Sequence, residues 1–286
     1  AYISQSDKGE LVIGAGTDQY TSYSQTGGLH IIQHTLDAIC EMFPMFTRMR
    51  MLREDGKIDL KYIKQVSQEI GLALKEKKDF HTIIVKSTVV PGTTEKVVSP
   101  IIEKASGKKE GEGFATAMNP EFLREGLAIE DFFNPDRIVL GTKNQKAMQL
   151  LEELYQKTSA PTLKTTPSTA EMIKYASNSF LATKISFINE LGNLCKSIGI
   201  DTYEVAQGMG MDKRISPMFL QSGCGFGGSC FGKDVSALAF KGKEEGQTMT
   251  LLEEVLLINK KQPLKMVDLL KKHFKDLNNK NIAVLG

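Results

Sequence analysis

Helical stretches and short β-branched runs alternate along the chain between residues 59 and 141. Leu60, Ile63 and Val66 begin a series of apolar residues at mostly helical spacing, and the run Thr82-Ile83-Ile84-Val85 follows it. A short apolar run rich in β-branched residues is typical of a buried strand. Because helices and buried strands that alternate are the pattern of βα units, the sequence predicts an α/β fold built around a parallel sheet.

The same alternation predicts further elements after residue 90. Helices are expected over 93–105 and 144–157, and strands over 114–118, 138–140 and 161–164. In sheets of this kind, ligands bind beyond the carboxyl ends of the strands. Thr88 and Glu121 each follow a predicted strand, which makes them candidate site residues.

A long helix is predicted after Pro167. The segment Ser168 to Glu171 has the sequence of a capping box, and apolar residues then recur without a breaker up to Gly199. About 30 residues at about 1.5 Å each give a helix on the order of 45 Å long. Its apolar positions extend further around the helix than one small domain covers, which predicts a partner helix and hence a homodimer.

Two further helical segments are expected downstream. A shorter helix begins near Asp201, and the segment Met249 to Phe274 is largely helical. Pro263 lies inside that last segment and either kinks the helix or begins a new one. The part of the chain after Pro167 is therefore expected to be an α-helical layer.

A glycine-rich loop lies within this helical layer and delivers Cys230. Four glycines occupy the six positions 223–228, and Lys233 and Asp234 follow the cysteine. Glycines let the backbone approach a ligand closely, and Lys233 or a helix starting after Cys230 would favour the reactive thiolate. The alternative is a glycine-rich turn with a buried, inert cysteine. The density of glycine favours a nucleophile, with Asp234 placed to orient a water or take a proton.

Residues 225–234 resemble the active-site loop of the UDP-glucose/GDP-mannose dehydrogenase family, except at Gly232, where that family usually has Pro or Gln. Further motifs of the family occur in the same order along the chain, at residues 86–94, 119–126, 135–141, 174–178 and 210–215. The resemblance covers Asp55 to Gly286. It favours UDP-glucose as the substrate, with GDP-mannose and UDP-N-acetylhexosamines as alternatives.

This resemblance implies an NAD-dependent, four-electron oxidation of UDP-glucose to UDP-glucuronate, which supplies polysaccharide biosynthesis. Cys230 would attack the C6 aldehyde to give a thiohemiacetal, and a second oxidation would leave a thioester. Water would hydrolyse the thioester with help from Asp234 and Glu121. Lys174 and Asn178 are four residues apart, on one helix face, and would steady the C6 oxygen. Thr88 completes the expected catalytic set.

The resemblance also assigns binding residues. Substrate-binding residues are expected to be Phe122, Leu123, Arg124, Glu125, Arg214, Phe219 and Gly227, with Arg214 reaching the substrate of the partner subunit. Cofactor-binding residues are expected to be Gly14, Gly16, Thr88, Glu125 and Lys233. Leu11 to Gly16 resembles the strand and turn of a dinucleotide fingerprint, although Gln19 stands where a third glycine is expected.

Composition excludes several other classes of function. The net charge of +2 gives no electrostatic reason to expect nucleic acid or an acidic membrane as a partner. No run approaches 18 apolar residues, and we expect a cytoplasmic protein. The four cysteines form no Cys-x-x-Cys pair and are expected to be free thiols. His30 and His34 are four residues apart but have no nearby acidic third ligand, so no metal is expected.

Three domains are predicted. Residues 1–165 would form an NAD-binding, Rossmann-like domain in which residues 1–54 are divergent or incomplete, and residues 166–274 a central helical domain for dimerisation and the catalytic loop. Residues 275–286 would be the first strand of a truncated domain that binds the nucleotide sugar, so the chain alone is expected to be nearly inactive. A noncatalytic homodimeric relative is the alternative, and a thiol hydrolase is disfavoured because no histidine lies in a motif near Cys230.

Overall fold

The computed structural model of the chain describes residues 2–5, 11–14, 58–124, 126–228 and 230–274. Contacts divide the described chain between Ser177 and Asn178, inside a long helix. We call the described residues 58–177 the first unit and 178–274 the second unit, and each is described separately.

The first unit contains a four-stranded sheet. Its strands are β3 (His81–Val85), β4 (Phe114–Met118), β5 (Ile138–Gly141) and β6 (Thr162–Thr165), in the order β3-β4-β5-β6. The β3–β4 and β5–β6 pairs are parallel, with Val85 opposite Met118 and Gly141 opposite Thr165. The predicted α/β class is therefore confirmed, and the two β-α-β pairings are parallel as expected.

The β4–β5 pair departs from the predicted parallel arrangement, because it is antiparallel and meets at Met118 and Gly141. A parallel neighbour needs a crossover that returns the chain to the starting end of the sheet, usually through a helix packed along the sheet. The connection here holds only a six-residue helix, α4 (Ala128–Phe133). This short helix explains why β5 runs in the opposite direction to β4.

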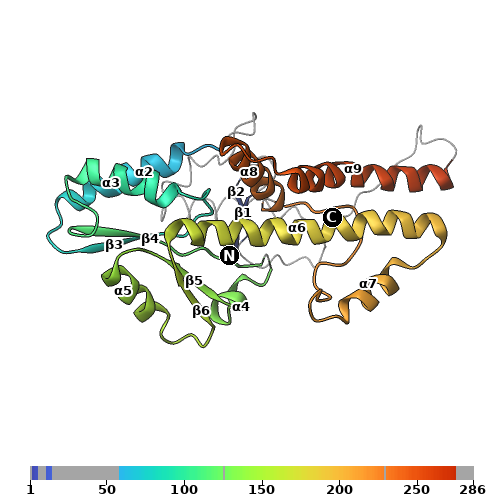
Figure 1. The fold of residues 1–286 in the computed structure, drawn as a ribbon, viewed down its shortest axis with the longest axis horizontal. Helices are drawn as coiled ribbons and strands as arrows, with labels where there is room; N and C mark the ends of the chain where they lie inside the picture. The colour runs from blue at the N-terminus through green and yellow to red at the C-terminus, as the bar shows by residue number, and fades with distance from the viewer. Residues whose placement is uncertain (1, 6–10, 15–57, 125, 229, 275–286) are drawn as a thin grey trace. The chain divides into compact units, whose positions relative to one another are not determined.

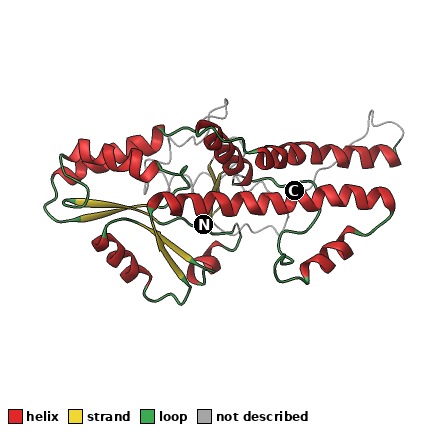
Figure 2. Cartoon of the chain, viewed as in Figure 1, coloured by secondary structure: helices red, strands yellow, loops and turns green. Residues whose placement is uncertain are grey.

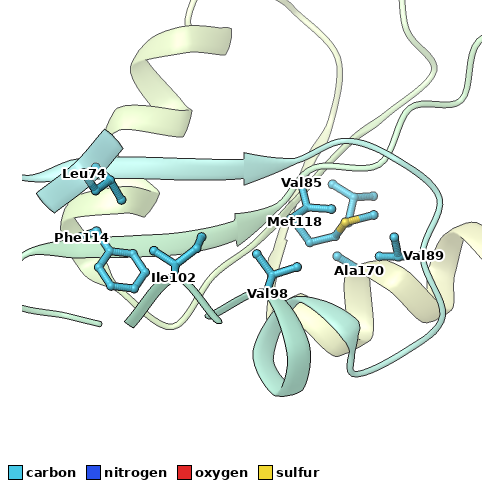
Figure 3. Close-up of a cluster of buried hydrophobic side chains, with 9 residues drawn as sticks. Leu74, Val85, Val89, Val98, Ile102, Phe114, Met118 and Ala170 are labelled. Atoms are coloured by element: carbon cyan, nitrogen blue, oxygen red, sulfur yellow. The ribbon is translucent and has the colours of Figure 1, made fainter. Parts of the chain in front are cut away.

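Helices cover both faces of this sheet (Figure 1). One face carries α2 (Lys61–Lys75), the π-helical turn η2 (Thr94–Val98) and α3 (Ser99–Ser106), and the other carries α5 (Gln145–Tyr155). Alternate residues of β4 face opposite ways, so Phe114 and Met118 pack toward α3 whereas Ala117 packs toward α5. Figure 3 shows the first of these clusters, in which Ile102 lies next to Phe114.

Helices α2 and α3 approach closely at a glycine. A Cβ atom added to Gly71 would lie 2.5 Å from the Cβ of Ala105, so no larger residue fits there without a shift of the backbone. The close approach lets Leu74 and Ile102 enter the same buried cluster. This cluster fixes the position of β3 and β4, whose carboxyl ends carry the first part of the candidate site.

The helix α6 (Pro167–Ile198) is unbroken and passes from the first unit into the second (Figure 2). Its predicted length is confirmed, but the predicted capping box is wrong. The helix begins one residue earlier, at Pro167, and the Thr166 hydroxyl accepts the Thr169 N–H. The carboxylate of Glu171 instead accepts hydrogen bonds from the backbone of Gly92 and from the backbone and hydroxyl of Thr94.

The second unit is helical, as predicted. After α6 come α7 (Thr202–Gly210), α8 (Phe231–Glu244) and α9 (Thr250–His273), and the glycine-rich loop lies between α7 and α8. Pro263 lies inside α9, which continues past it, so the alternative in which Pro263 begins a new helix is wrong.

Two short strands precede the first unit in the sequence. The strands β1 (Tyr2–Gln5) and β2 (Leu11–Gly14) pair with each other in a separate two-stranded sheet. The predicted strand Leu11 to Gly16 thus corresponds to β2, but its partner is β1, whereas the four-stranded sheet begins with β3. Gly16 and Gln19, in the expected phosphate-binding turn, lie outside the described residues, as do residues 275–286.

Candidate active site

The carboxyl ends of β3 and β4 are joined by the side chain of Asn119. The Asn119 backbone N–H donates to the Val85 carbonyl at 2.9 Å, and the side-chain Oδ1 accepts from Lys86 Nζ at 2.8 Å and from the Tyr155 hydroxyl. Its Nδ2 donates to the Val139 carbonyl at 2.9 Å. Asn119 is buried and therefore holds together the two loops that follow these strands.

Thr88 and Glu121 lie on these two loops, as predicted. Thr88 follows β3 and is half-buried, and Glu121 follows β4 two residues after Asn119. Sequence reasoning did not identify Asn119 or Tyr155 as residues that support the site. An asparagine immediately after a predicted buried strand was the available signal, because a buried amide needs several hydrogen-bond partners.

Lys174 from α6 contacts the second of these loops. Its Nζ donates to the Glu121 carbonyl at 2.7 Å and to the Glu121 Oε1 at 2.9 Å. The Lys174 side chain is only 7% exposed, whereas that of Glu121 is 35% exposed. The structure therefore brings together two predicted catalytic residues, a desolvated cation and a carboxylate that remains accessible to water.

The ring of Phe122 packs against two cations. Lys174 Nζ lies 5.4 Å from the ring centroid, and the guanidinium carbon of Arg137 lies 4.0 Å from it. Arg137 Nη2 also donates to the Ser177 hydroxyl of α6 at 3.1 Å. Cation–π contacts of this kind order both the ring and the cation, so Phe122, predicted to bind substrate, here also helps to place Lys174.

Two further predicted substrate residues of this loop, Leu123 and Arg124, are exposed. The Arg124 guanidinium donates to both carboxylate oxygens of Asp131, including a bond of 2.6 Å from Nη2. These hydrogen bonds hold the pKa of Asp131 below its usual value. Leu123 is exposed, and its N–H donates to Glu121 Oε2 at 2.8 Å. Glu125 lies outside the described residues.

The second unit contains a separate cluster of predicted residues. Asn178 Nδ2 donates to Asp234 Oδ2 at 2.7 Å, and Lys233 Nζ lies 2.6 Å from Asp234 Oδ1. Asp234 is 1% exposed, so its charge is almost completely removed from water and is compensated by these two donors. Asn178 of α6 is thus joined to the neighbouring residues Lys233 and Asp234 of α8 in one network around a single carboxylate.

Cys230 is the N-cap residue of α8, and it is exposed. The Asp234 N–H donates to the Cys230 carbonyl at 2.9 Å, which begins the helix. The exposure of Cys230 argues against a buried, inert cysteine, and Cys224 is exposed in the same loop while Cys195 is buried in α6.

Aromatic side chains surround the start of α8. The ring of Phe231 makes edge contacts with those of Phe219, at 6.2 Å, and Phe226, at 5.8 Å. Phe219 has a φ of 65°, a conformation that is rare for a bulky residue and costs on the order of 1–3 kcal/mol. Backbone strain at Phe219 favours a functional role for this residue. Its place in the binding site stays a prediction.

Two other predicted binding residues of the second unit are at the surface. Gly227 is exposed in the glycine-rich loop. The Arg214 guanidinium is exposed and donates to both carboxylate oxygens of Asp212, at 2.6 to 3.1 Å. Its predicted contact with a partner subunit's substrate stays a prediction.

The described residues fit a nucleotide cofactor at one point. Thr88 lies at the carboxyl end of a parallel strand pair, the edge at which such sheets bind nucleotides. Lys233 fits less directly, because its ammonium is paired with Asp234. Gly14 ends β2, and Gly16 lies outside the described residues.

The described residues contain neither a candidate metal site nor a candidate membrane-spanning helix. Among the described residues, no group of three or more His, Cys, Asp or Glu side chains is arranged to hold a metal ion. His30 and His34 lie outside that part of the chain. No helix within the described ranges combines the length and the apolar character that crossing a bilayer requires.

Two models of one protein family match consecutive parts of the chain. Residues 51–159 match the NAD binding domain of the UDP-glucose/GDP-mannose dehydrogenase family, and residues 168–261 match its central domain. The chain is 47% identical over 238 residues to the UDP-glucose 6-dehydrogenase AglM of Haloferax volcanii, covering 82% of this chain and 55% of that protein. It is 40% identical over 236 residues to the GDP-mannose 6-dehydrogenase of Pseudomonas aeruginosa, covering 82% and 53%.

A solved structure gives a similar result. The UDP-glucose dehydrogenase from the hyperthermophilic archaeon Pyrobaculum islandicum has 44% sequence identity and a TM-score of 0.75, with 78% of this chain and 51% of that chain covered. The chain thus spans about half the length of the relatives that it matches.

Proposed function

The chain belongs to the UDP-glucose/GDP-mannose dehydrogenase family, and from this premise we propose that it carries the catalytic residues for the NAD-dependent oxidation of UDP-glucose to UDP-glucuronate. The observation that carries the proposal is the position of Cys230 at the N-terminus of α8, four residues before a buried Asp234 that Asn178 holds. This arrangement supplies a nucleophile and a fixed carboxylate on the same helix. UDP-glucose is preferred because two UDP-glucose 6-dehydrogenases are 47% and 44% identical to the chain.

The first oxidation requires that charge on the C6 oxygen be stabilised. Lys174 supplies a desolvated cation, which is worth more in a water-excluded site than at the surface. In the proposed complex the C6 oxygen takes one of the positions around Nζ that Glu121 now occupies. Asn178 lies one helical turn further along α6 and donates a second hydrogen bond to the substrate. When bound, NAD would accept the hydride that leaves C6 in each of the two oxidations, and the proton of the oxidised hydroxyl group would pass to water.

Cys230 divides the reaction into two oxidations of a bound carbon. Its sulfur adds to the C6 aldehyde, and the thiol proton goes to the aldehyde oxygen, which gives a thiohemiacetal. After the second oxidation a thioester joins Cys230 to C6. Water then attacks this carbon, the C–S bond breaks, and the thiol and the carboxylate product are released. Glu121 and Asp234 are the carboxylates proposed to orient the water and accept its proton.

Thr88 is proposed to contact the cofactor from the carboxyl end of β3, where the residue is half-buried. Lys233 is proposed to contribute its charge indirectly, through Asp234. A cytoplasmic location is also proposed, because thiolate chemistry at Cys230 requires a reducing compartment.

A homodimer formed through α6 is proposed as the assembly. Three large apolar side chains, those of Phe180, Phe187 and Leu194, are exposed on this helix at seven-residue intervals. Residues seven apart lie on one side of a helix, so these three form a stripe that a second copy of α6 would cover.

The test measures NADH formation with UDP-glucose, GDP-mannose and UDP-N-acetylglucosamine in parallel, in a longer protein that supplies both of the end domains expected from the sequence, together with calorimetry of NAD and each nucleotide sugar. Oxidation of UDP-glucose in preference to the others supports the proposal. Oxidation of GDP-mannose alone would transfer the proposed chemistry to that substrate. Failure to bind either NAD or a nucleotide sugar would favour the noncatalytic relative.

A further inference from the structure

Side-chain amides hold the backbone of the glycine-rich loop at Gly223. The Gly223 N–H donates to Asn189 Oδ1 of α6 at 2.7 Å, and its carbonyl accepts from Gln262 Nε2 of α9 at 2.8 Å. Asn193 of α6 donates to the Gln262 Oε1 at 2.9 Å, which fixes the orientation of that amide. Both polar groups of one residue in the loop are thus satisfied by two different helices of the second unit.

A further side-chain amide, that of Asn259, holds the loop at Phe226. The Phe226 N–H donates to Asn259 Oδ1 at 2.7 Å, and Asn259 Nδ2 donates to the Phe226 carbonyl at 2.9 Å. The Asn259 amide therefore pairs with the loop as a neighbouring strand would. Phe226 lies four residues before Cys230, and its ring contacts Phe231 on the other side of the cysteine.

Gly225 is required by this pairing. Its φ is 106°, which side-chain-bearing residues rarely adopt, and a Cβ at this position would lie 2.6 Å from Asn259 Oδ1. The glycine thus allows the loop to come within hydrogen-bonding distance of α9. The sequence run is explained here by a protein partner of the loop as well as by the approach of a ligand.

The burial of these amides carries an energetic cost. Gln262 and Asn189 are buried, and the Asn189 Nδ2 has no hydrogen-bond partner among the described residues. A buried amide donor without a partner is destabilising, because it has lost its hydrogen bonds with water. Asn189 therefore contributes little to stability by itself, and its contact with Gly223 is the interaction that the site gains from it.

We propose that Asn189, Asn259 and Gln262, the amide clamp, are positioning residues that hold the loop delivering Cys230 in its reactive placement. The inference rests on the proposed function, since it assigns these residues a role in thiohemiacetal and thioester formation. A glycine-rich loop has almost no side chains with which to order itself, and its backbone groups need external partners. The amide clamp supplies them from α6 and α9.

The test compares Asn259→Ala with Ser186→Ala. Asn259→Ala removes both hydrogen bonds to Phe226. Ser186→Ala removes a buried hydrogen bond of 3.3 Å between α6 and α9, from the Ser186 hydroxyl to the Val255 carbonyl, without touching the loop. Asn259→Asp serves as a second variant, because it keeps an acceptor for the Phe226 N–H and replaces the donor to the Phe226 carbonyl by a second carboxylate oxygen. Each protein is examined by thermal unfolding, by hydrogen exchange of the peptide carrying Phe226 and Cys230, and by turnover.

We expect Asn259→Ala to speed hydrogen exchange in that peptide by about 30-fold, because two hydrogen bonds of about 1 kcal/mol each are lost. Turnover should fall by about 10²-fold with little change in KM, since a misplaced nucleophile affects the chemical step. For Asn259→Asp, the exchange rate and the turnover should lie between those of the unsubstituted protein and those of Asn259→Ala. Ser186→Ala should alter neither measurement.

Exchange and turnover that respond equally to Asn259→Ala and Ser186→Ala would overturn the proposal and leave the amides a role in stability alone. If the unsubstituted protein binds no nucleotide sugar, the proposed function fails, whereas hydrogen exchange still decides whether the amide clamp orders Cys230.

Discussion

Lys174 is the residue whose environment differs most from that of an ordinary surface lysine. Its ammonium is desolvated beside Glu121 and Phe122. We expect Lys174→Ala to lower kcat by about 10²-fold or more and to raise KM much less, because charge develops on the C6 oxygen mainly in the transition state. Steady-state kinetics with UDP-glucose measure both constants.

Lys143→Ala is the matched control, since Lys143 is exposed and pairs with Glu95 of the same unit. It should leave both constants near those of the unsubstituted protein. An increase in KM alone for Lys174→Ala would make Lys174 a binding residue and contradict the role given to it here.

Cys230 and Cys224 provide a matched pair of substitutions within one loop, because both cysteines are exposed. Cys230→Ser should abolish formation of UDP-glucuronate without changing the fold, since a hydroxyl is not activated as a thiol is. Cys224→Ser should retain turnover. Product analysis after prolonged incubation makes the measurement, and complete oxidation by Cys230→Ser would rule out the thioester route.

Sequence motifs identified these residues, but not the side chains that hold them. Lys174 with Glu121, and Asn178 with Asp234, were predicted site residues, and the structure brings each pair into hydrogen-bonding contact. Asn119 and Asn259 were missed, because a polar residue after a strand or inside a helix does not reveal which distant backbone it contacts. Their partners lie on other elements, and only the tertiary structure shows them.

At the scale of elements, Glu171 links α6 to the segment that follows the Thr88 loop. Its carboxylate is completely buried and accepts hydrogen bonds from Gly92 and Thr94. The sequence pattern predicted a local capping box instead, since Ser168 to Glu171 fits that motif. Pro167 starts the helix one residue earlier, which leaves Glu171 available for a contact across the first unit.

Burial raises the pKa of Glu171 above its ordinary value of 4.5, and the hydrogen bonds from Thr94 and Gly92 only partly oppose this. A raised folded-state pKa means that the folded protein binds the proton more tightly, so the corresponding stability is complete below pH 4.5 and is lost as pH rises through the folded-state pKa. Urea denaturation at a series of pH values should show that the free energy of unfolding of the unsubstituted protein, relative to that of Glu171→Gln, declines as the pH rises above 4.5.

The isosteric variant Glu171→Gln lacks the titrating group, so it serves as the reference for the unsubstituted protein at each pH. A difference in stability between the two proteins that does not depend on pH would show that Glu171 ionises with the same pKa in the folded and unfolded states. Proton binding to Glu171 would then have no effect on the stability of the folded protein.

The order of helices and strands was largely predictable from periodicity, whereas strand direction was not. The run Phe114 to Met118 and the run Ile138 to Gly141 are both recognisable as buried strands. Their antiparallel pairing depends on the path of residues 119–137, where α4 is too short to form a full crossover. Local apolar patterns contain no information about that path.

For the whole molecule, the division of contacts falls inside α6, between Lys174 on one side and Asn178 on the other. The predicted domain limits at residues 165 and 274 stay predictions. Lys174 and Asn178 are nevertheless four residues apart, about one turn, on the single helix α6.

Dimerisation is the property of the whole molecule that the exposed stripe on α6 predicts. Phe180 is 65%, Phe187 46% and Leu194 55% exposed. Covering a large apolar side chain is worth about 1.5–3 kcal/mol, and a symmetric dimer covers each residue twice. Phe187→Glu should therefore shift the protein toward monomer, as measured by light scattering at micromolar concentration. Leu154→Glu, at an exposed position of α5, tests whether any charged substitution has this effect and should not change the mass. A monomer in the unsubstituted protein, or an equal response to both substitutions, would show that the stripe on α6 is not the interface.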